Sequence, residues 1–127
     1  MELIPFAGEL GIELHEAGPD LVRGRLAWAP ERTTTADVMH GGAIMALADT
    51  CGGICAYLNL PDGAQGTATI ESKTNFLRAI TEGSANAATR PLHKGRTLIV
   101  LETEVSRDDG KLAAKVTQTQ TYLYGRG

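Results

Sequence analysis

The sequence lacks the features that mark several large classes of protein. Its only cysteines are Cys51 and Cys55. Their spacing on an expected helix suits two buried thiols better than a disulfide or a zinc site, which needs more ligands. No apolar run reaches the roughly 18 residues of a membrane-spanning helix, and residues 1–10 lack the charged and apolar regions of a signal peptide. We therefore expect a cytoplasmic protein with no bound metal or other cofactor and no contact with a membrane.

A strong charge of one sign is also absent. Lys and Arg number 12 against 15 Asp and Glu, and the formal net charge of -3 gives no general attraction to nucleic acid. The chain has no internal repeat, no glycine-rich phosphate loop and no G-x-S-x-G nucleophile elbow. These absences argue against nucleic-acid binding and against the common nucleotide-binding and serine-hydrolase classes.

The residues that are present fit one domain spanning residues 1–127, since 43% of them are hydrophobic and 21% charged. Apolar side chains recur at helical spacing from Ala43 to Leu58, and the turn residues 61–63 end the pattern. Gly52 and Gly53 interrupt this helix at about 1 kcal/mol each relative to alanine. We therefore expect them to allow the close approach of another backbone.

Alternating apolar and polar residues predict strands on both sides of this helix. The expected strands cover residues 12–17 and 21–29 before it, and 67–76, 83–90, 97–106 and 111–124 after it. Strict alternation in the first of the later strands places Ala68, Ile70, Ser72, Thr74 and Phe76 on one face, with Thr69, Glu71, Lys73 and Asn75 on the other. Because no helices separate the later strands, we predict an α+β fold in which an antiparallel sheet wraps around one long helix.

The segment His40-Gly41-Gly42 stands directly before the helix. The first turn of a helix has unpaired backbone N–H groups at the positive end of the helix dipole, and glycine lets a ligand carbonyl approach them. The segment therefore predicts an oxyanion hole. Asp49 follows on the apolar helix, where a carboxylate loses hydration unless it meets polar partners. We interpret Asp49 as catalytic, with a structural carboxylate bonded to the backbone as the alternative.

Together with residues 75–78 (Asn-Phe-Leu-Arg) and 95–98 (Gly-Arg-Thr-Leu), this helix motif resembles the hotdog-fold acyl-CoA thioesterases, in particular the phenylacetyl-CoA thioesterase-like branch. The resemblance covers nearly the whole chain. It implies a long central helix wrapped by a curved antiparallel sheet of five to six strands. It also implies subunits joined edge to edge, as a homodimer or homotetramer, with active sites between them.

Two further residues take roles from this resemblance. The family often carries an asparagine that helps to polarise the thioester carbonyl at the position of Thr34, whose hydroxyl donates one hydrogen bond but reaches less far. Thr69 matches a Ser or Thr that helps to orient the attacking water, although an ordinary strand threonine is the alternative. Thr34 and Thr69 are therefore expected to assist the reaction.

Gly41 and Asp49 cannot act on the same carbonyl within one chain. Eight residues on a straight helix correspond to a rise of about 12 Å and a rotation of about 80°. A twofold axis that brings a second helix alongside can place the helix start of one chain near Asp49 of the other. In such a site the Gly41 N–H polarises the carbonyl, and Asp49 acts as general base or as nucleophile.

The remaining candidates position or bind the substrate. We expect His40 to fix the turn through a hydrogen bond to the backbone, and Gly42 to assist Gly41 or only to give space. A second group would contact the phosphates of coenzyme A, with a solvated turn as the alternative: Arg90, His93, Lys94 and Arg96. A third group would line the acyl pocket, although core packing explains it equally well: Met45, Tyr57, Leu58 and Phe76.

These expectations combine into an acyl-CoA thioesterase that hydrolyses an aromatic or medium-chain acyl-CoA to the free acid and coenzyme A. An alternative enzyme class is a hotdog hydratase or dehydratase of enoyl-CoA, which would need His40 as acid or base. A non-catalytic sensor that binds acyl-CoA is the third reading. Hydration of a double bond would indicate the hydratase, and binding without turnover would indicate the sensor.

Overall fold

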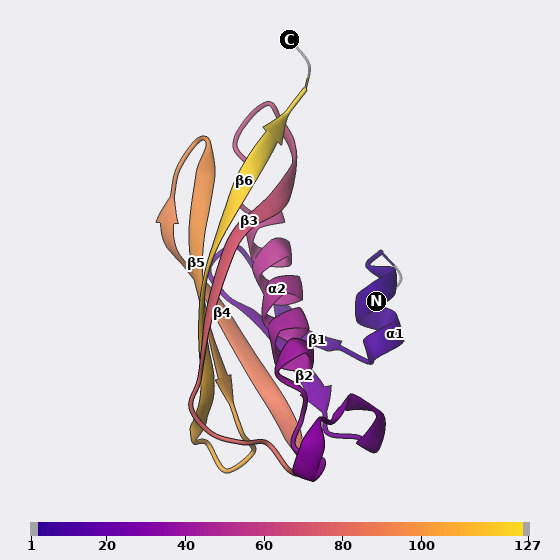
Figure 1. Cartoon of the computed structure of the whole chain (residues 1–127). Coiled ribbons are helices and arrows are strands. Elements are labelled where there is room, and N and C mark those ends of the chain that lie inside the picture. The colour runs from indigo at the N-terminus through magenta and orange to yellow at the C-terminus, as the bar shows by residue number, and fades with distance from the viewer. Residues whose placement is uncertain (1–2, 126–127) are drawn as a thin grey trace.

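The computed structural model describes residues 3–125 and has one long helix packed against one six-stranded sheet (Figure 1). The helices are α1 (Pro5–Leu10) and α2 (Gly41–Tyr57), with 3-10 turns at Pro30–Arg32 and Thr35–Asp37. The strands are β1 (Glu13–Ala17), β2 (Val22–Ala27), β3 (Ala64–Phe76), β4 (Ser84–Lys94), β5 (Leu98–Ser106) and β6 (Leu112–Tyr124). The predicted fold class and the predicted order of two strands, one long helix and four strands are confirmed.

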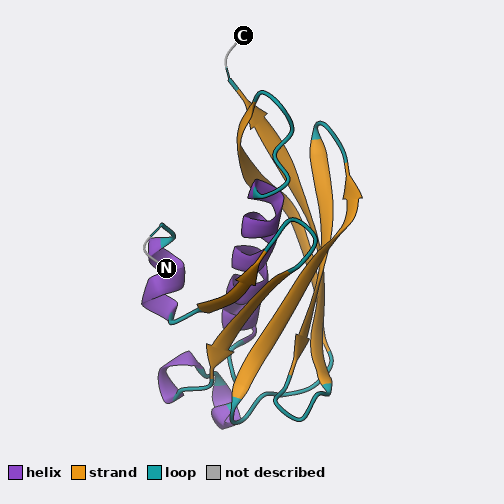
Figure 2. Ribbon diagram, turned by 180° about the vertical axis from the view of Figure 1, so that it is seen from behind, coloured by secondary structure: helices purple, strands orange, loops and turns teal. Residues whose placement is uncertain are grey.

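Helix α2 lies lengthwise along one face of the curved sheet, as both ribbon views show (Figure 2). Its buried face includes Ile44, Leu47 and Cys51, and these side chains meet the apolar inner face of the strands in one hydrophobic core. The helix ends at Tyr57, and the chain then turns at residues 58–63 into β3. Among the described residues, no helix is both long and apolar enough to cross a membrane.

The sheet is antiparallel throughout, in the order β1-β2-β4-β5-β6-β3. β3 therefore forms one edge of the sheet and pairs only with β6 among the described strands, although it is 13 residues long. Long edge strands with unpaired backbone groups are available for pairing with another chain. The edge strand β3 is such a strand, and it also contacts α2 through the hydrogen bond between Thr69 and Asp49.

A β-bulge in β3 corrects the predicted alternation of that strand. Thr69 lies opposite Gln120, and Glu71 lies opposite Thr119, so Ile70 is the extra residue. Residues opposite each other in an antiparallel pair share a face of the sheet. The bulge therefore places Thr69 on the helix side, together with Thr74 and Phe76, whereas strict alternation had placed it on the opposite face.

The expected role of the helix glycines is also corrected. A Cβ built on Gly52 would lie 1.8 Å from Gln118 Oε1 and 2.5 Å from its Cδ, so the space belongs to a side-chain amide of β6 and not to another backbone. At Gly53 the nearest atom to such a Cβ is Gln120 Nε2, 4.0 Å away, which leaves room for a methyl group. Of these two helix glycines, only Gly52 is required by close packing, which is against the Gln118 side chain.

Candidate functional site

The start of α2 is held by a side-chain cap. His40 Nδ1 accepts a hydrogen bond of 2.7 Å from the Gly42 N–H, and a Cβ on Gly42 would lie 2.9 Å from that nitrogen. Gly42 therefore gives space to the cap, and its own N–H is engaged. Among residues 3–125 no hydrogen bond uses the Gly41 N–H. This N–H is the donor that remains for a ligand at the positive end of the helix dipole.

A hollow of about 360 Å³ opens beside this helix start, and its lining includes Thr34, Gly41, Ile44, Phe76 and Ile80. The ring of Phe76 lies directly over Gly41, since a Cβ there would be 3.0 Å from Phe76 Cζ. Two of the predicted polarising groups, Thr34 and the Gly41 backbone, thus border one mainly apolar hollow. The lining does not include Asp49.

The loop that carries Thr34 has an unusual backbone. Ala36 and Asp37 have φ values of 62° and 60°, in the left-handed region that non-glycine residues seldom adopt. The Thr34 N–H donates to the Val38 carbonyl at 2.8 Å, and Trp28 Nε1 donates to the Asp37 carbonyl at 2.8 Å. These bonds hold the loop in place against the hollow.

Asp49 is exposed on α2 and receives two hydrogen bonds, both on Oδ1. Thr69 Oγ1 donates at 2.7 Å from β3, and Gln118 Nε2 donates at 2.8 Å from β6. Gln120 Nε2 in turn donates to Thr69 Oγ1 at 2.5 Å. Two donors from two different strands therefore hold the Asp49 carboxylate by the same oxygen. In the described part of the chain, Oδ2 accepts no hydrogen bond, so it remains open to water or substrate.

The sequence predicts that Asp49 and Thr69 act at one site, whereas the structure adds Gln118 and Gln120, which were not predicted. A signal for them was present, because β6 alternates so that both glutamines share a face with the buried Val116 and Tyr122. A buried amide must find a hydrogen-bond partner. Two of them facing a helix that carries one carboxylate would have indicated this network.

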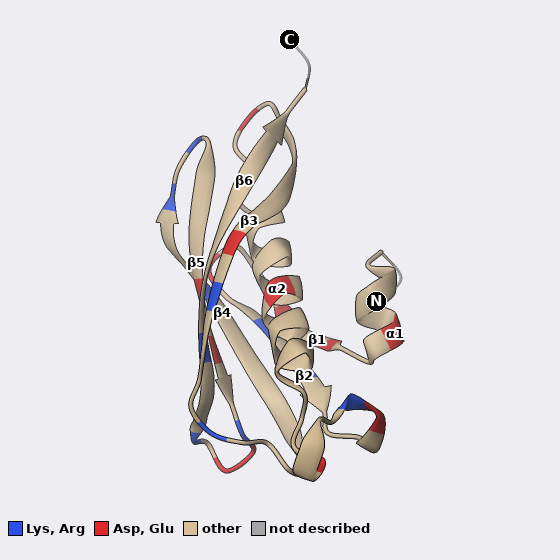
Figure 3. Cartoon of the chain, in the orientation of Figure 1, with Lys and Arg blue, Asp and Glu red and all other residues tan. Residues whose placement is uncertain are grey.

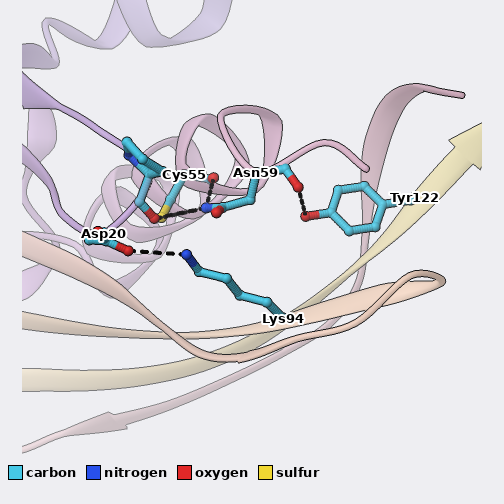
Figure 4. Close-up of polar contacts among 6 residues, drawn as sticks. Asp20, Cys55, Asn59, Lys94 and Tyr122 are labelled. Carbon is cyan, nitrogen blue, oxygen red and sulfur yellow. Dashed lines mark hydrogen bonds and ion pairs between the residues drawn. The ribbon is translucent and has the colours of Figure 1, made fainter. Parts of the chain in front are cut away.

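The basic residues are spread over more than one place. Lys94, at the end of β4, pairs with Asp20 at 3.1 Å near the C-terminal end of α2 (Figure 4). At the same place, the Asn59 amide donates to the Pro19 carbonyl, and the Tyr122 hydroxyl donates to the Asn59 carbonyl. Arg96 follows in the β4–β5 turn, where positive charge gathers (Figure 3). Arg90 lies within β4, opposite Glu102 in the register, and not at the turn. The expected cluster therefore reduces to its members at the tip, which are exposed to solvent.

Of the residues expected to line an acyl pocket, Phe76 borders the hollow and the others do not. Met45 and Tyr57 are on α2 with 39% and 59% of their surface exposed, and Leu58 follows with 42%. Cys51 and Cys55 are buried, free thiols, and burial raises the pKa of Cys51 to about 12. In residues 3–125 no group of three or more His, Cys, Asp or Glu side chains could hold a metal ion.

Comparison with known proteins shows which family this chain resembles in sequence and fold. The model of the thioesterase superfamily matches residues 36–114. The proofreading thioesterase EntH of Cronobacter turicensis is 31% identical over 102 residues, 80% of this chain and 74% of that protein. The 1,4-dihydroxy-2-naphthoyl-CoA hydrolase of Escherichia coli is 27% identical over 116 residues, 91% and 85% of the two chains. The structure of the E. coli PaaI protein has the same fold, with a TM-score of 0.87 at 20% identity over 98% of this chain and 88% of that one.

Proposed function

The chain belongs to the thioesterase superfamily and hydrolyses thioesters, and we propose that its substrate is an aromatic or medium-chain acyl-CoA, cleaved at a site shared by two copies of the chain. The observation that carries this proposal is the division of the site along α2. The Gly41 N–H, which has no acceptor among the described residues, lies at the helix start beside the hollow, and the hydrogen-bonded Asp49 carboxylate lies about two turns further on. A second copy of the chain reunites the two halves.

In the proposed mechanism the thioester carbonyl accepts a hydrogen bond from the Gly41 N–H, with the Thr34 hydroxyl as a second donor. Negative charge develops on that oxygen in the transition state, and one such donor contributes about 3 to 4 kcal/mol. His40 supports this arrangement from outside the reacting atoms, because its ring nitrogen fixes the first turn through the Gly42 N–H. Hydrolysis then requires a group that activates water or attacks the carbonyl.

Asp49 of the second copy supplies that group. As general base, Asp49 Oδ2 takes a proton from water while the water oxygen bonds to the carbonyl carbon. The C–S bond then breaks and the proton passes to the departing thiolate. As nucleophile, the same oxygen forms an anhydride with the acyl group and releases the thiolate, and water then cleaves the anhydride. Thr69 holds Oδ1 in either route, which keeps Oδ2 directed outward.

The hollow beside Gly41 supports the proposed acyl group. Its volume of about 360 Å³ falls at the lower end of the roughly 300–1,000 Å³ typical of small-molecule sites. Phe76 and Ile44 give it an apolar lining, which suits a ring or a chain of medium length. The E. coli relative that acts on 1,4-dihydroxy-2-naphthoyl-CoA is a precedent for an aromatic acyl group in this family.

Coenzyme A and the second copy complete the proposal. We expect Lys94 and Arg96, at the β4–β5 tip, to contact the phosphates, with Arg90 further along β4. Lys94 remains available because its pairing with the exposed Asp20 is a surface ion pair of little strength. The edge of β3, which has no partner strand within residues 3–125, favours pairing with the same edge of a second copy, as a homodimer or within a homotetramer.

A panel of acyl-CoA substrates tests reaction class and specificity together. Benzoyl-, phenylacetyl-, hexanoyl-, palmitoyl- and crotonyl-CoA are incubated with the protein, and free thiol is measured with a chromogenic disulfide. We expect thiol release, with the aromatic or hexanoyl members preferred. Hydration of crotonyl-CoA without thiol release would instead indicate a hydratase, and saturable binding without turnover would indicate an acyl-CoA sensor. Preference for palmitoyl-CoA would overturn the proposed substrate class.

A further inference from the structure

Gln118 is a buried amide on β6, the strand next to the edge strand β3, and its side chain faces α2. It is 1% exposed, and it lies on the helix face of β6 with its Nε2 2.8 Å from Asp49 Oδ1 and 3.4 Å from Thr69 Oγ1. Its carbonyl oxygen, Oε1, is buried without a hydrogen-bond partner among the described residues. A buried polar atom without a partner destabilises a fold, and an apolar side chain of the same length would avoid that cost.

Helix α2 has a second energetically unfavourable feature at the same place, a glycine. Gly52 sits where a Cβ would be 1.8 Å from Gln118 Oε1 and 2.9 Å from Nε2, so any other residue would push the amide aside. Glycine inside a helix is unfavourable relative to alanine. A buried oxygen without a partner and a helix glycine thus occur at the amide whose nitrogen donates to Asp49.

Resting on the function proposed above, we propose that Gln118 is a positioning residue for thioester hydrolysis. With Thr69 it fixes Oδ1 of Asp49 from below, so that Oδ2 faces the reacting water or carbonyl. Gly52 serves this purpose by giving the amide room. Gln118 does not touch the substrate in this role, and it acts only through Asp49. Gln120 differs, because it contacts Thr69 and has no bond to Asp49.

The first test is Gln118→Met, which retains the length of the side chain and removes the donor. We expect kcat to fall by about 10- to 100-fold, the range for losing a hydrogen bond to a charged group, with KM little changed. The melting temperature should stay level or rise, because the unpaired Oε1 disappears. A parallel loss of melting temperature and activity would indicate a structural role and overturn the proposal.

Gly52→Ala displaces the amide without altering Gln118, and Gly53→Ala is its matched control. The alanine methyl at 52 overlaps the amide, whereas at 53 it has open space. We expect Gly52→Ala to lower kcat by a similar factor and Gly53→Ala to leave it unchanged. In a chain that already carries Gln118→Ala, the 52 substitution should cause no further loss. A further loss of activity there would refute the coupling between Gly52 and Gln118.

Asp49→Asn in the same assay separates the two proposals. If Asp49→Asn is inactive and Gln118→Met retains wild-type kcat, the positioning role is wrong and the proposed function stands. If Asp49→Asn retains wild-type kcat, Asp49 is not the catalytic group and the positioning role of Gln118 fails with it, whereas the proposed function itself fails if the wild-type protein releases no thiol from the acyl-CoA panel. In the Asp49→Asn background, Gln118→Met should change the residual rate by less than about twofold, since Gln118 acts only through the carboxylate. An undiminished effect in that background would contradict the proposal.

Discussion

Replacing Asp49 by asparagine isolates the charge of the proposed catalytic group from its place in the structure. In the native chain, Oδ1 receives hydrogen bonds from Thr69 Oγ1 and Gln118 Nε2. The asparagine side chain has the same shape, and its carbonyl oxygen can accept both bonds. Its NH2 group then takes the outward place of Oδ2 on an exposed part of the helix, where water solvates it. The substitution should therefore leave the fold and its stability almost unchanged.

Catalysis should respond very differently. An amide neither takes a proton from water nor attacks a thioester at useful rates, so both routes open to Asp49 are lost. The typical contribution of such a group is about 10²- to 10⁴-fold in kcat, which corresponds to about 2.7 to 5.4 kcal/mol in activation free energy. KM should change by less than about threefold, because in the proposed site the hollow at Gly41 and the basic tip at Lys94 bind the substrate apart from the carboxylate.

The assay follows thiol release from the best substrate of the panel, together with the melting temperature and size-exclusion profile of each variant. Asp62→Asn is a matched control, because Asp62 is exposed in the segment between α2 and β3 and has no assigned role. It should retain wild-type kinetics. If folded Asp49→Asn keeps kcat within about threefold of wild type, Asp49 is neither base nor nucleophile, and its bonds to Thr69 and Gln118 are structural.

Three other predictions test parts of the same scheme. Asp49→Asn chains and Gly41→Pro chains, whose proline lacks the donor N–H, should each be inactive alone, and mixing them should restore activity in the exchanged heterodimers. If folded heterodimers recover no activity, the site is not shared between two chains. Replacing Lys94 and Arg96 together by alanine should raise KM for acyl-CoA more than it lowers kcat, with a smaller effect at high salt. If the double variant loses as much activity on a thioester that lacks the nucleotide, these two residues do not bind coenzyme A. Burial raises the pKa of Cys51 from 9.0 to about 12, so its thiol should resist alkylation at pH 8, and its contribution to stability should decline as the pH rises from 9 toward 12. Rapid labelling of Cys51 in the native protein, read by mass spectrometry, would contradict this.

Local patterns predicted most of the fold. The helical spacing from Ala43 to Leu58 located α2 within two residues at its start and one at its end, because helix periodicity and the following turn are written in neighbouring residues. The strands on either side were placed for the same reason. Helix α1 was missed, since its six residues, which begin with Pro5, hold too little periodicity to stand out from a loop.

Features that depend on distant contacts were not predictable in this way. The bulge at Ile70 has no turn residue to announce it, and it is fixed by pairing with β6, about 50 residues later in the chain. That one extra residue decides whether Thr69 faces α2 or the opposite side of the sheet. The sequence assigned Thr69 its role through family resemblance while strict alternation placed it on the wrong face. Only the register of β3 resolves this conflict.

The same dependence on distant contacts divides the candidate site. Residues at the helix start, Thr34 and Gly41, gather around the hollow because the loop before α2 folds against its first turn. Asp49 is held instead by β3 and β6, and its bonds reach residues 20 and 69 positions away. One chain thus completes each half separately and does not bring them to the same hollow. Because the edge of β3, next to Asp49 through Thr69, is left without a partner strand among the described residues, pairing at that edge would position a second copy where the halves can meet.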